Sequence, residues 1–306
     1  MNWCGWCAHT WRLTVTLVAS LTAQEAVIAT NQHYELPPEF FAAFLDRRLK
    51  YSCGLYPRED MSLDEAQTEK LHFIAREIGA REGARVLDIG CGWGSLTLFL
   101  AAEYGCRVTG ITPSRTQAAY IADLVTERSL ADRVRLTIGT FPGVSCEPGF
   151  SAVTMVGSVN HMPDQRTALA RVSDLLGRDG RLYLSESCFR STGMHAEFAR
   201  SPAARQVAED IFGYADMVPL SGLIRVAEDA GLSVTGVTDL TRHFRRTVED
   251  WIRRARDNRD AIEHALPGMS EPLMQYLTTT NAAWGYTTKQ YALTAVKNRL
   301  GPREMS

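Results

Sequence analysis

The chain has 306 residues, which is long enough to bury a sizeable hydrophobic core without disulfide or metal support. It carries 33 basic and 35 acidic residues, so it has no global positive field that would bind nucleic acid or an anionic membrane surface. Apolar residues make up 45% and charged residues 22%, which excludes a disordered chain and a multi-span membrane protein. We expect a globular protein whose partner is a small molecule or a lipid-like substrate.

The seven cysteines lack the dense spacing of a secreted disulfide scaffold, which favours a reducing compartment and predicts a cytoplasmic protein. The CxxC pair at residues 4–7 has no second pair to complete a zinc site, so we predict no metal. The apolar run over 13–21 is too short to span a bilayer, so we predict no stable membrane insertion. We expect a mobile or loosely docked segment over 1–30, a single domain over 31–300 and a short tail over 301–306.

Short apolar runs alternate with amphipathic stretches after about residue 32, a pattern typical of an α/β fold. The order of strand, glycine turn and helix over 85–104 is its most informative part. Strands are predicted at 85–89, 107–111, 134–138, 152–156, 181–185, 234–237 and 290–296. Helices are predicted at 37–45, 63–78, 95–104, 117–128, 167–176, 202–212, 222–230, 248–264 and 272–283. We expect the helices between the last two strands to form a cap, mainly within 189–283.

A glycine-rich turn follows the first buried strand. Asp88 closes that strand, and Gly90, Gly92 and Gly94 then allow the backbone to approach a ligand closely. A dinucleotide site would have the spacing GxGxxG and an acidic residue at the end of the next strand. Here the spacing is GxGxG and the next strand ends in Thr112, so the turn favours a nucleoside-like ligand other than NAD.

Several segments together resemble one known family. They are 31–36 with Phe40 and Phe41, 51–53, 86–95 and 108–117. In this order and spacing they are similar to the S-adenosylmethionine-dependent methyltransferases around cyclopropane fatty acid synthase and the mycolic acid cyclopropane synthases. The resemblance extends over about residues 31–300. It implies a class I, Rossmann-like methyltransferase sheet with N-terminal helices and a helical cap.

The resemblance implies S-adenosylmethionine as the methyl donor and S-adenosylhomocysteine as the product. The glycines would surround its amino-acid part, Thr112 and Gln117 would contact the ribose and adenosine, and Phe141 would stack on the adenine. Thr140 stands where relatives commonly carry an acid, which removes one expected hydrogen bond. Simple packing is the alternative role for Tyr34 and Phe141. The full set implied around the cofactor is Tyr34, Tyr51, Ser52, Asp88, Gly90, Gly92, Gly94, Thr112, Gln117 and Phe141.

Cyclopropane synthases close their ring with a bound bicarbonate, held by a cysteine, a glutamate, a histidine and a tyrosine. Cys53 is retained in this chain, but Asn160 stands at the position of the glutamate. Ser185 replaces the histidine and Phe244 replaces the tyrosine. Because a buried anion needs strongly polar partners, these replacements disfavour a bicarbonate-dependent cyclopropane synthase.

Methyl transfer from a sulfonium is an in-line displacement, so the enzyme mainly positions the acceptor and excludes water. His161 is a candidate general base, or else a residue that holds a loop beside the cofactor. Glu186 is a second candidate base, or else a surface or loop carboxylate. The predicted catalytic set is His161, Asn160, Cys53 and Glu186.

Aromatic residues in and near the predicted cap could line an apolar pocket and stabilise a cation, although core packing is the alternative for each. They are Tyr214, Phe244, Trp251, Trp284 and Tyr286. A basic cluster could bind a phosphate or carboxylate, or could be a solvated helix face balanced by Glu249 and Asp250. It contains Arg242, His243, Arg245, Arg246, Arg253 and Arg254.

The sequence therefore predicts methyl transfer to a small, largely apolar specialised metabolite or lipid. We favour methylation of an alkene carbon through a carbocation, without bicarbonate-assisted ring closure. The alternatives are N- or O-methylation, a bicarbonate-dependent cyclopropane synthase, and a protein that binds S-adenosylmethionine and steers a cyclisation without methyl transfer. The oligomeric state is not predicted.

Overall fold

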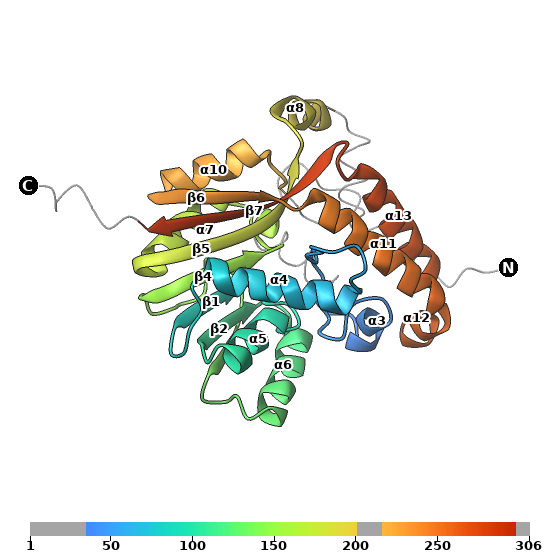
Figure 1. The fold of residues 1–306 in the computed structure, drawn as a ribbon, viewed down its shortest axis with the longest axis horizontal. Helices are drawn as coiled ribbons and strands as arrows, with labels where there is room; N and C mark the ends of the chain where they lie inside the picture. Colours follow the sequence, from blue (N-terminus) through green and yellow to red (C-terminus); the bar gives the residue numbers. More distant parts are fainter. Residues whose placement is uncertain (1–34, 201–215, 298–306) are drawn as a thin grey trace, which may run out of the picture.

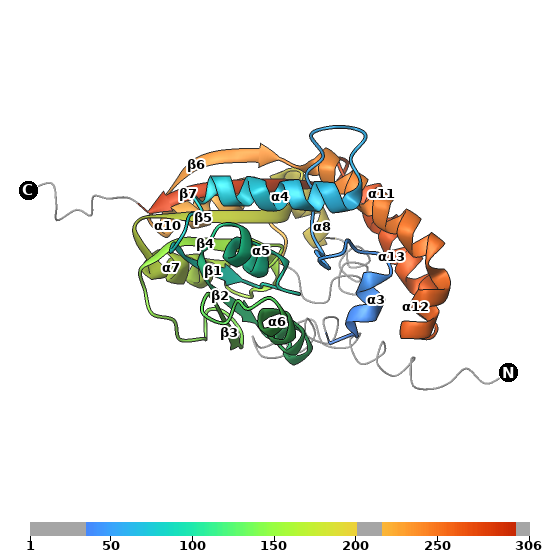
Figure 2. The same ribbon diagram turned by 60° about the horizontal axis from the view of Figure 1, so that its bottom comes forward.

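The computed structural model describes residues 35–200 and 216–297. A mixed β-sheet forms the centre, with helices on both faces and a helical group at one end (Figures 1 and 2). The predictions that lie outside the described residues concern Tyr34, Tyr214, the helix over 202–212, the segment 1–30 and the tail 301–306.

Seven strands form one sheet in the spatial order β3 (Val134–Ile138), β2 (Arg107–Thr112), β1 (Arg85–Ile89), β4 (Phe150–Val156), β5 (Leu176–Phe189), β7 (Thr288–Lys297) and β6 (Leu232–Asp239). Strands β1 to β5 are parallel, and β7 runs antiparallel to both β5 and β6. Each of the seven predicted strands lies inside an observed one. Because the carboxyl ends of parallel strands share one edge, the turns that follow β1, β2 and β4 lie close together.

Helices cover both faces of this sheet, because successive side chains of each buried strand point to opposite sides. One face packs against α4 (Leu63–Glu77), α5 (Ser95–Glu103) and α6 (Arg115–Glu127). The other packs against α7 (Gln165–Leu175) and α10 (Leu220–Asp229). The layered α/β fold predicted from the sequence is confirmed.

A third hydrophobic cluster lies at one end of the sheet. It joins α3 (Pro38–Ala42) to α11 (Thr241–Asp257), α12 (Arg259–Ala265) and α13 (Ser270–Ala283). Figures 1 and 2 both show these helices gathered beside the edge where β1 ends. Helices α11 to α13 connect β6 to β7, which is the position predicted for a cap.

The single helix predicted over 248–264 is wrong. The chain leaves the helical conformation at Asn258, with φ −110° and ψ 30°, and this residue separates α11 from α12. The Asn258 side chain donates a hydrogen bond at 2.9 Å to the backbone carbonyl of Ala43. The break therefore depends on a tertiary partner more than 200 residues away, which local periodicity does not reveal.

Other element boundaries differ from prediction by smaller amounts. The first predicted helix ends at Ala42 instead of residue 45, and β5 is longer than predicted at both ends. Helix α8 (Thr192–Arg200) was not predicted. Among the helices in the described ranges, none combines the length and apolar character needed to cross a bilayer.

Candidate active site

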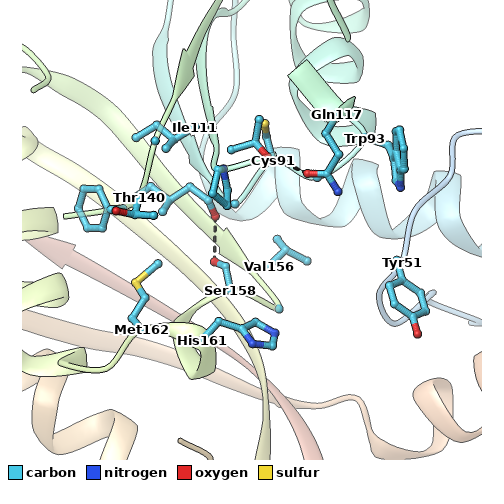
Figure 3. Close-up of a pocket in the computed structure, with 18 of the residues that line it drawn as sticks. Tyr51, Cys91, Trp93, Ile111, Gln117, Thr140, Val156, Ser158, His161 and Met162 are labelled. Carbon is cyan, nitrogen blue, oxygen red and sulfur yellow. Dashed lines mark hydrogen bonds between the residues drawn. The ribbon is translucent and has the colours of Figure 1, made fainter. Parts of the chain in front are cut away.

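A cavity of about 840 Å³ lies at the carboxyl edge of β1, β2 and β4. Figure 3 shows Thr140 and Met162 toward one side of it, Tyr51 and Trp93 toward the other, and Ser158 and His161 between them. Its wall combines mainly apolar side chains with a few polar groups, which suits a small-molecule site. The wall is formed by residues 49–51, 89–93, Ser95, 111–113, Gln117, 139–143, 156–158 and 161–164.

The three glycines of the turn share a backbone conformation but differ in what surrounds them. All have positive φ, at 75°, 57° and 78°. A Cβ at Gly90 would lie 2.6 Å from the Ser158 Cβ, and a Cβ at Gly94 would lie 2.8 Å from the Ile121 Cγ1. At Gly92 the same atom would meet nothing within 4 Å. Gly90 and Gly92 line the cavity, whereas Gly94 permits close packing behind it.

Asp88 is fully buried and does not line the cavity. Its carboxylate accepts hydrogen bonds from the Thr97 and Thr154 hydroxyls, both at 2.8 Å. These bonds tie β1 to α5 and β4 directly below the glycine turn. The structure therefore gives Asp88 a positioning role for the turn, in place of the direct cofactor contact implied by the resemblance.

The residues expected to contact the ribose and the adenine also line the cavity. The Thr112 hydroxyl donates to Gln117 Oε1 at 2.7 Å, which orients the Gln117 amide beside the end of β2. Thr140 and Phe141 line the cavity from the loop after β3. The side chains of Thr112, Gln117 and Phe141 are thus brought together along one wall.

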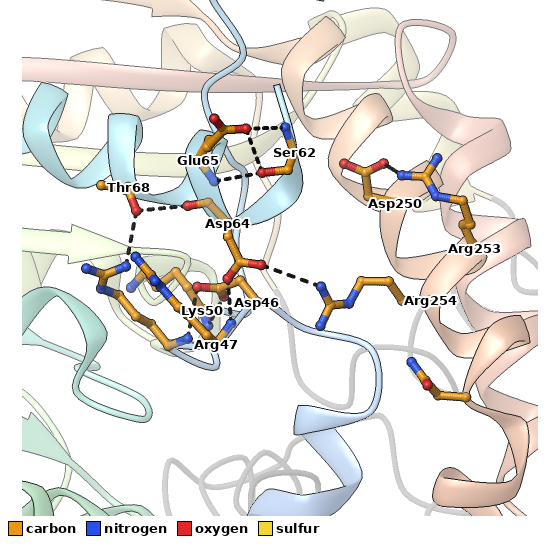
Figure 4. Close-up of polar contacts among 12 residues, drawn as sticks. Asp46, Arg47, Lys50, Ser62, Asp64, Glu65, Thr68, Asp250, Arg253 and Arg254 are labelled. Atoms are coloured by element: carbon orange, nitrogen blue, oxygen red, sulfur yellow. Dashed lines mark hydrogen bonds and ion pairs between the residues drawn. The ribbon is translucent and has the colours of Figure 1, made fainter. Parts of the chain in front are cut away.

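The loop between α3 and α4 forms the opposite wall. Tyr51 lines the cavity, whereas Ser52 is buried behind it and accepts a hydrogen bond from Lys70 Nζ at 3.0 Å. Lys50 also lines the cavity, although nothing in the sequence singled it out. Its backbone N–H donates to the Asp46 carboxylate at 2.7 Å, which fixes this part of the loop (Figure 4).

Glu186 holds the turn that carries His161. Glu186 Oε2 accepts hydrogen bonds from the backbone N–H groups of Val159 at 3.1 Å and Asn160 at 3.3 Å. Oε1 accepts from the backbone N–H of Ser187 at 3.1 Å. Burial raises the pKa of Glu186 to about 7, even though these backbone hydrogen bonds favour the ionised form. Glu186 is 5% exposed, so the alternative of a surface carboxylate is wrong.

His161 is the predicted catalytic residue that lines the cavity. It ends the 3₁₀ turn Val159–His161, and its ring lies beside Ser158 in Figure 3. Ser158 donates to the Ile89 carbonyl at 2.8 Å and so links this turn to the end of β1. A ring nitrogen at this position can exchange a proton with a bound acceptor.

Neutral groups stand where the resemblance places the bicarbonate ligands. Ser185 accepts a hydrogen bond from Gln290 Nε2 at 3.0 Å, and Asn160 Nδ2 donates to the Ser187 carbonyl at 2.9 Å. Gln290, on β7, was not predicted as part of the site. Neither Asn160 nor Ser185 is part of the cavity wall.

Cys53 does not line the cavity either. Its thiol donates toward the carbonyl oxygens of Gly54 at 3.1 Å and Leu240 at 3.7 Å. Burial raises the pKa of Cys53 to about 12, so the thiol is protonated at neutral pH. The side chain therefore serves packing and local hydrogen bonding, and the structure does not support the predicted catalytic role for it.

Three of the predicted pocket aromatics form one cluster. The ring centroid of Phe244 lies 4.5 Å from that of Trp284 and 5.9 Å from that of Trp251. Trp251 lies 5.2 Å from Tyr51, which connects the cluster to the cavity wall. Tyr286 is 74% exposed on the turn before β7, so its predicted place in the pocket is wrong.

The predicted basic cluster is largely paired within the protein (Figure 4). Arg254 lies 3.7 Å from Asp64, and Arg253 pairs with Asp250. Arg246 donates to three backbone carbonyls in the loop before α4. Arg246 and Arg254 thus connect α11 to the α4 region, whereas Arg253 and Arg245 pair within α11 with Asp250 and Glu249. These pairs agree with the alternative of a helix face balanced by Glu249 and Asp250.

The strand order, the glycine turn and the cavity at the carboxyl edge define a class I, Rossmann-like methyltransferase fold. The chain belongs to the mycolic acid cyclopropane synthetase family, whose family model matches residues 22–292. This family uses S-adenosylmethionine as its methyl donor, and the predicted family and fold are both confirmed.

Similarity to individual proteins agrees with this membership. A probable fatty acid methyltransferase from Pseudomonas putida is 31% identical over 229 residues. The matched region is 73% of this chain and only 57% of that relative's length. The crystal structure of mycolic acid cyclopropane synthase CmaA1 with S-adenosylhomocysteine has a TM-score of 0.80 and 26% identity, covering 89% of this chain and 98% of that one. A coclaurine N-methyltransferase structure, with N-methylheliamine and S-adenosylhomocysteine, has a TM-score of 0.77 and 25% identity, covering 94% and 87%.

Proposed function

We propose that this protein transfers a methyl group from S-adenosylmethionine to an alkene carbon of a small, largely apolar metabolite or lipid. The observation that carries the proposal is the cavity itself, with its open glycine cradle at Gly92 and a histidine on its wall. The similarity to a probable fatty acid methyltransferase supports a lipid-like acceptor.

The residues present fit the donor. The open space in front of Gly92 would let the amino-acid part of S-adenosylmethionine lie close to the backbone. Thr112 and Gln117 offer polar groups to its ribose. Phe141 offers a ring face to an adenine. When bound, S-adenosylmethionine supplies an electrophilic methyl group.

The acceptor side of the cavity has only a few polar groups. Val156, Met162 and Tyr51 contribute apolar surface that would exclude water from the reacting atoms. The aromatic cluster behind Tyr51 offers ring faces to a developing positive charge. His161 accepts the proton that a methylated alkene must lose, which leaves an unsaturated methylated product.

The polar groups of Asn160, Ser185 and Gln290 argue against ring closure by bicarbonate. Asn160 and Ser185 are engaged in neutral hydrogen bonds, and Phe244 has no hydroxyl to offer. An anion buried there would lack charged partners. The proton is therefore taken by His161 in this proposal.

N-methylation is the second candidate, supported by the similarity to a coclaurine N-methyltransferase structure. An amine acceptor would use the same cavity, and His161 would take the proton from nitrogen after transfer. The two candidates differ in the atom that carries the new methyl group.

The test is incubation of the full chain with methyl-labelled S-adenosylmethionine and separate panels of unsaturated fatty acyl lipids, isoprenoid alkenes, amines and phenols. We expect S-adenosylhomocysteine to form with an alkene, and NMR of the product to place the label on carbon. Turnover only with amines would replace the first candidate by the second, and turnover only with phenols would indicate O-methylation. Tight S-adenosylhomocysteine binding without turnover on any panel would instead favour a non-transferase role, such as steering a cyclisation.

A further inference from the structure

Lys50 is a buried lysine in the wall of the cavity, immediately before Tyr51. It is 6% exposed and lines the same cavity as Cys91 and Trp93, which belong to the glycine turn. Among residues 35–200 and 216–297, no carboxylate oxygen lies within 4.0 Å of its ammonium. A buried ammonium without an ion-pair partner is costly unless a ligand supplies the negative charge.

A second buried lysine nearby, Lys70, differs from Lys50 because its ammonium has a hydrogen-bond partner within the protein. Lys70 is also buried, but it does not line the cavity and its ammonium donates to the Ser52 hydroxyl at 3.0 Å. Burial lowers the pKa of both lysines. The positive charge of Lys50 lowers the pKa of Lys70 further. The nearby counter-charges that both lysines share are two buried carboxylates, Asp46 and Asp88.

Two carboxylates, those of Asp88 and Asp46, raise the pKa of Lys50, but neither forms an ion pair with its ammonium. Asp88 and Asp46 act on Lys50 through space, but Asp88 is engaged by two threonine hydroxyls. Asp46 accepts hydrogen bonds from the backbone N–H groups of Arg48 and Lys50. Both carboxylates thus hold the backbone and the sheet through hydrogen bonds, and the Lys50 ammonium can still form a direct hydrogen bond with a ligand.

We propose that Lys50 binds the carboxylate of the methionine portion of the cofactor. The inference rests on the proposed placement of the cofactor, with its adenine near Phe141 and its amino-acid part at the glycine turn. Lys50 and the turn residue Cys91 both line the cavity and are near enough to interact electrostatically, which places Lys50 beside the glycine turn. Only the amino-acid end of the cofactor, which is proposed to lie at this turn, carries a carboxylate. An ammonium–carboxylate hydrogen bond in a site with little water is stronger than one in bulk solvent.

The experiment measures binding, so no methyl acceptor is needed. Isothermal titration calorimetry compares S-adenosylhomocysteine with decarboxylated S-adenosylhomocysteine, which lacks only the carboxylate. The proteins are the full wild-type chain, Lys50→Met, Lys50→Arg and, as the matched buried-lysine control, Lys70→Met. Thermal unfolding of each variant reports whether it is folded.

For the wild type we expect binding of S-adenosylhomocysteine to be at least about tenfold tighter than binding of the decarboxylated analogue. Lys50→Met should remove this preference by weakening only the carboxylate-bearing ligand, and Lys50→Arg should keep part of it. Lys70→Met should keep the preference even if it lowers the melting temperature.

Equal weakening of both ligands in Lys50→Met would overturn the inference, because it would indicate a purely structural role. Unchanged binding of both ligands in Lys50→Met would also overturn it. If this variant then bound a fatty acid carboxylate more weakly than the wild type, the Lys50 ammonium would be assigned to binding the methyl acceptor. Failure of the wild type to bind S-adenosylhomocysteine at all would instead reject the proposed function.

Discussion

The carboxylate of Glu186 accepts a hydrogen bond from the backbone N–H of Asn160, so a side chain on β5 fixes the turn that presents His161 to the cavity. The same oxygen also accepts from the N–H of Val159. One buried acid therefore organises two donors of a single 3₁₀ turn. This relationship makes Glu186 a positioning residue, because it does not line the cavity itself.

The raised pKa of Glu186 predicts a pH-dependent stability. Its pKa rises from 4.5 to about 7 on folding, so the folded state retains a proton that the unfolded state releases between these values. The stability contribution is complete below pH 4.5 and is lost as the pH rises through 7, by roughly 3 kcal/mol at most. The free energy of unfolding of the wild type minus that of Glu186→Gln should fall across this range and be constant above it. A difference that does not vary with pH would contradict the prediction.

His161 gives the second prediction. His161→Ala should lower kcat by about 10² to 10⁴-fold if the imidazole takes the proton. The affinity for S-adenosylhomocysteine should change little, because the residues expected to bind it are intact. His264→Ala, an exposed change on α12, is the matched control and should leave both quantities unchanged. A loss of affinity that equals the loss of kcat would show that His161 only shapes the site.

The sequence predicted the strands well because each contains a short apolar run bounded by turn residues. It did not predict the helix break at Asn258, since the acceptor on Ala43 is provided by tertiary packing. Lys50 resembled an ordinary loop lysine, and its burial arises only when the loop packs against the turn. The bond between Gln290 and Ser185 needs β7 to pair with β5, which local sequence does not specify.

The glycine turn offers a matched pair of substitutions. Gly92 and Gly94 both have positive φ, so replacement by alanine imposes similar backbone strain at the two sites. At Gly92 the new methyl group projects into open space, where the cofactor is proposed to bind, whereas at Gly94 it meets the Ile121 side chain at 2.8 Å. Gly92→Ala should therefore weaken S-adenosylhomocysteine binding by tenfold or more. Gly94→Ala should lose about 1–3 kcal/mol more stability than Gly92→Ala, through overpacking.

Calorimetric titration and thermal unfolding of the two variants check this prediction. We expect Gly92→Ala to show the larger loss of affinity and Gly94→Ala the larger loss of stability. Equal loss of affinity in two equally stable variants would show that the turn conformation, and not the space in front of Gly92, controls binding.

The last prediction concerns bicarbonate. Ser185 is engaged by Gln290, Asn160 by the Ser187 carbonyl, and Phe244 carries no hydroxyl. Added bicarbonate should therefore change neither the rate of product formation nor the product. The measurement is turnover on the best alkene acceptor in degassed buffer, with and without bicarbonate, at constant pH and ionic strength. The variant Gln290→Ala removes the amide that donates to the Ser185 hydroxyl, yet it should remain insensitive to bicarbonate because no charged partner for the anion is created. A cyclopropane product that forms only with bicarbonate would contradict the prediction, because it would show that the neutral groups present here can hold the anion.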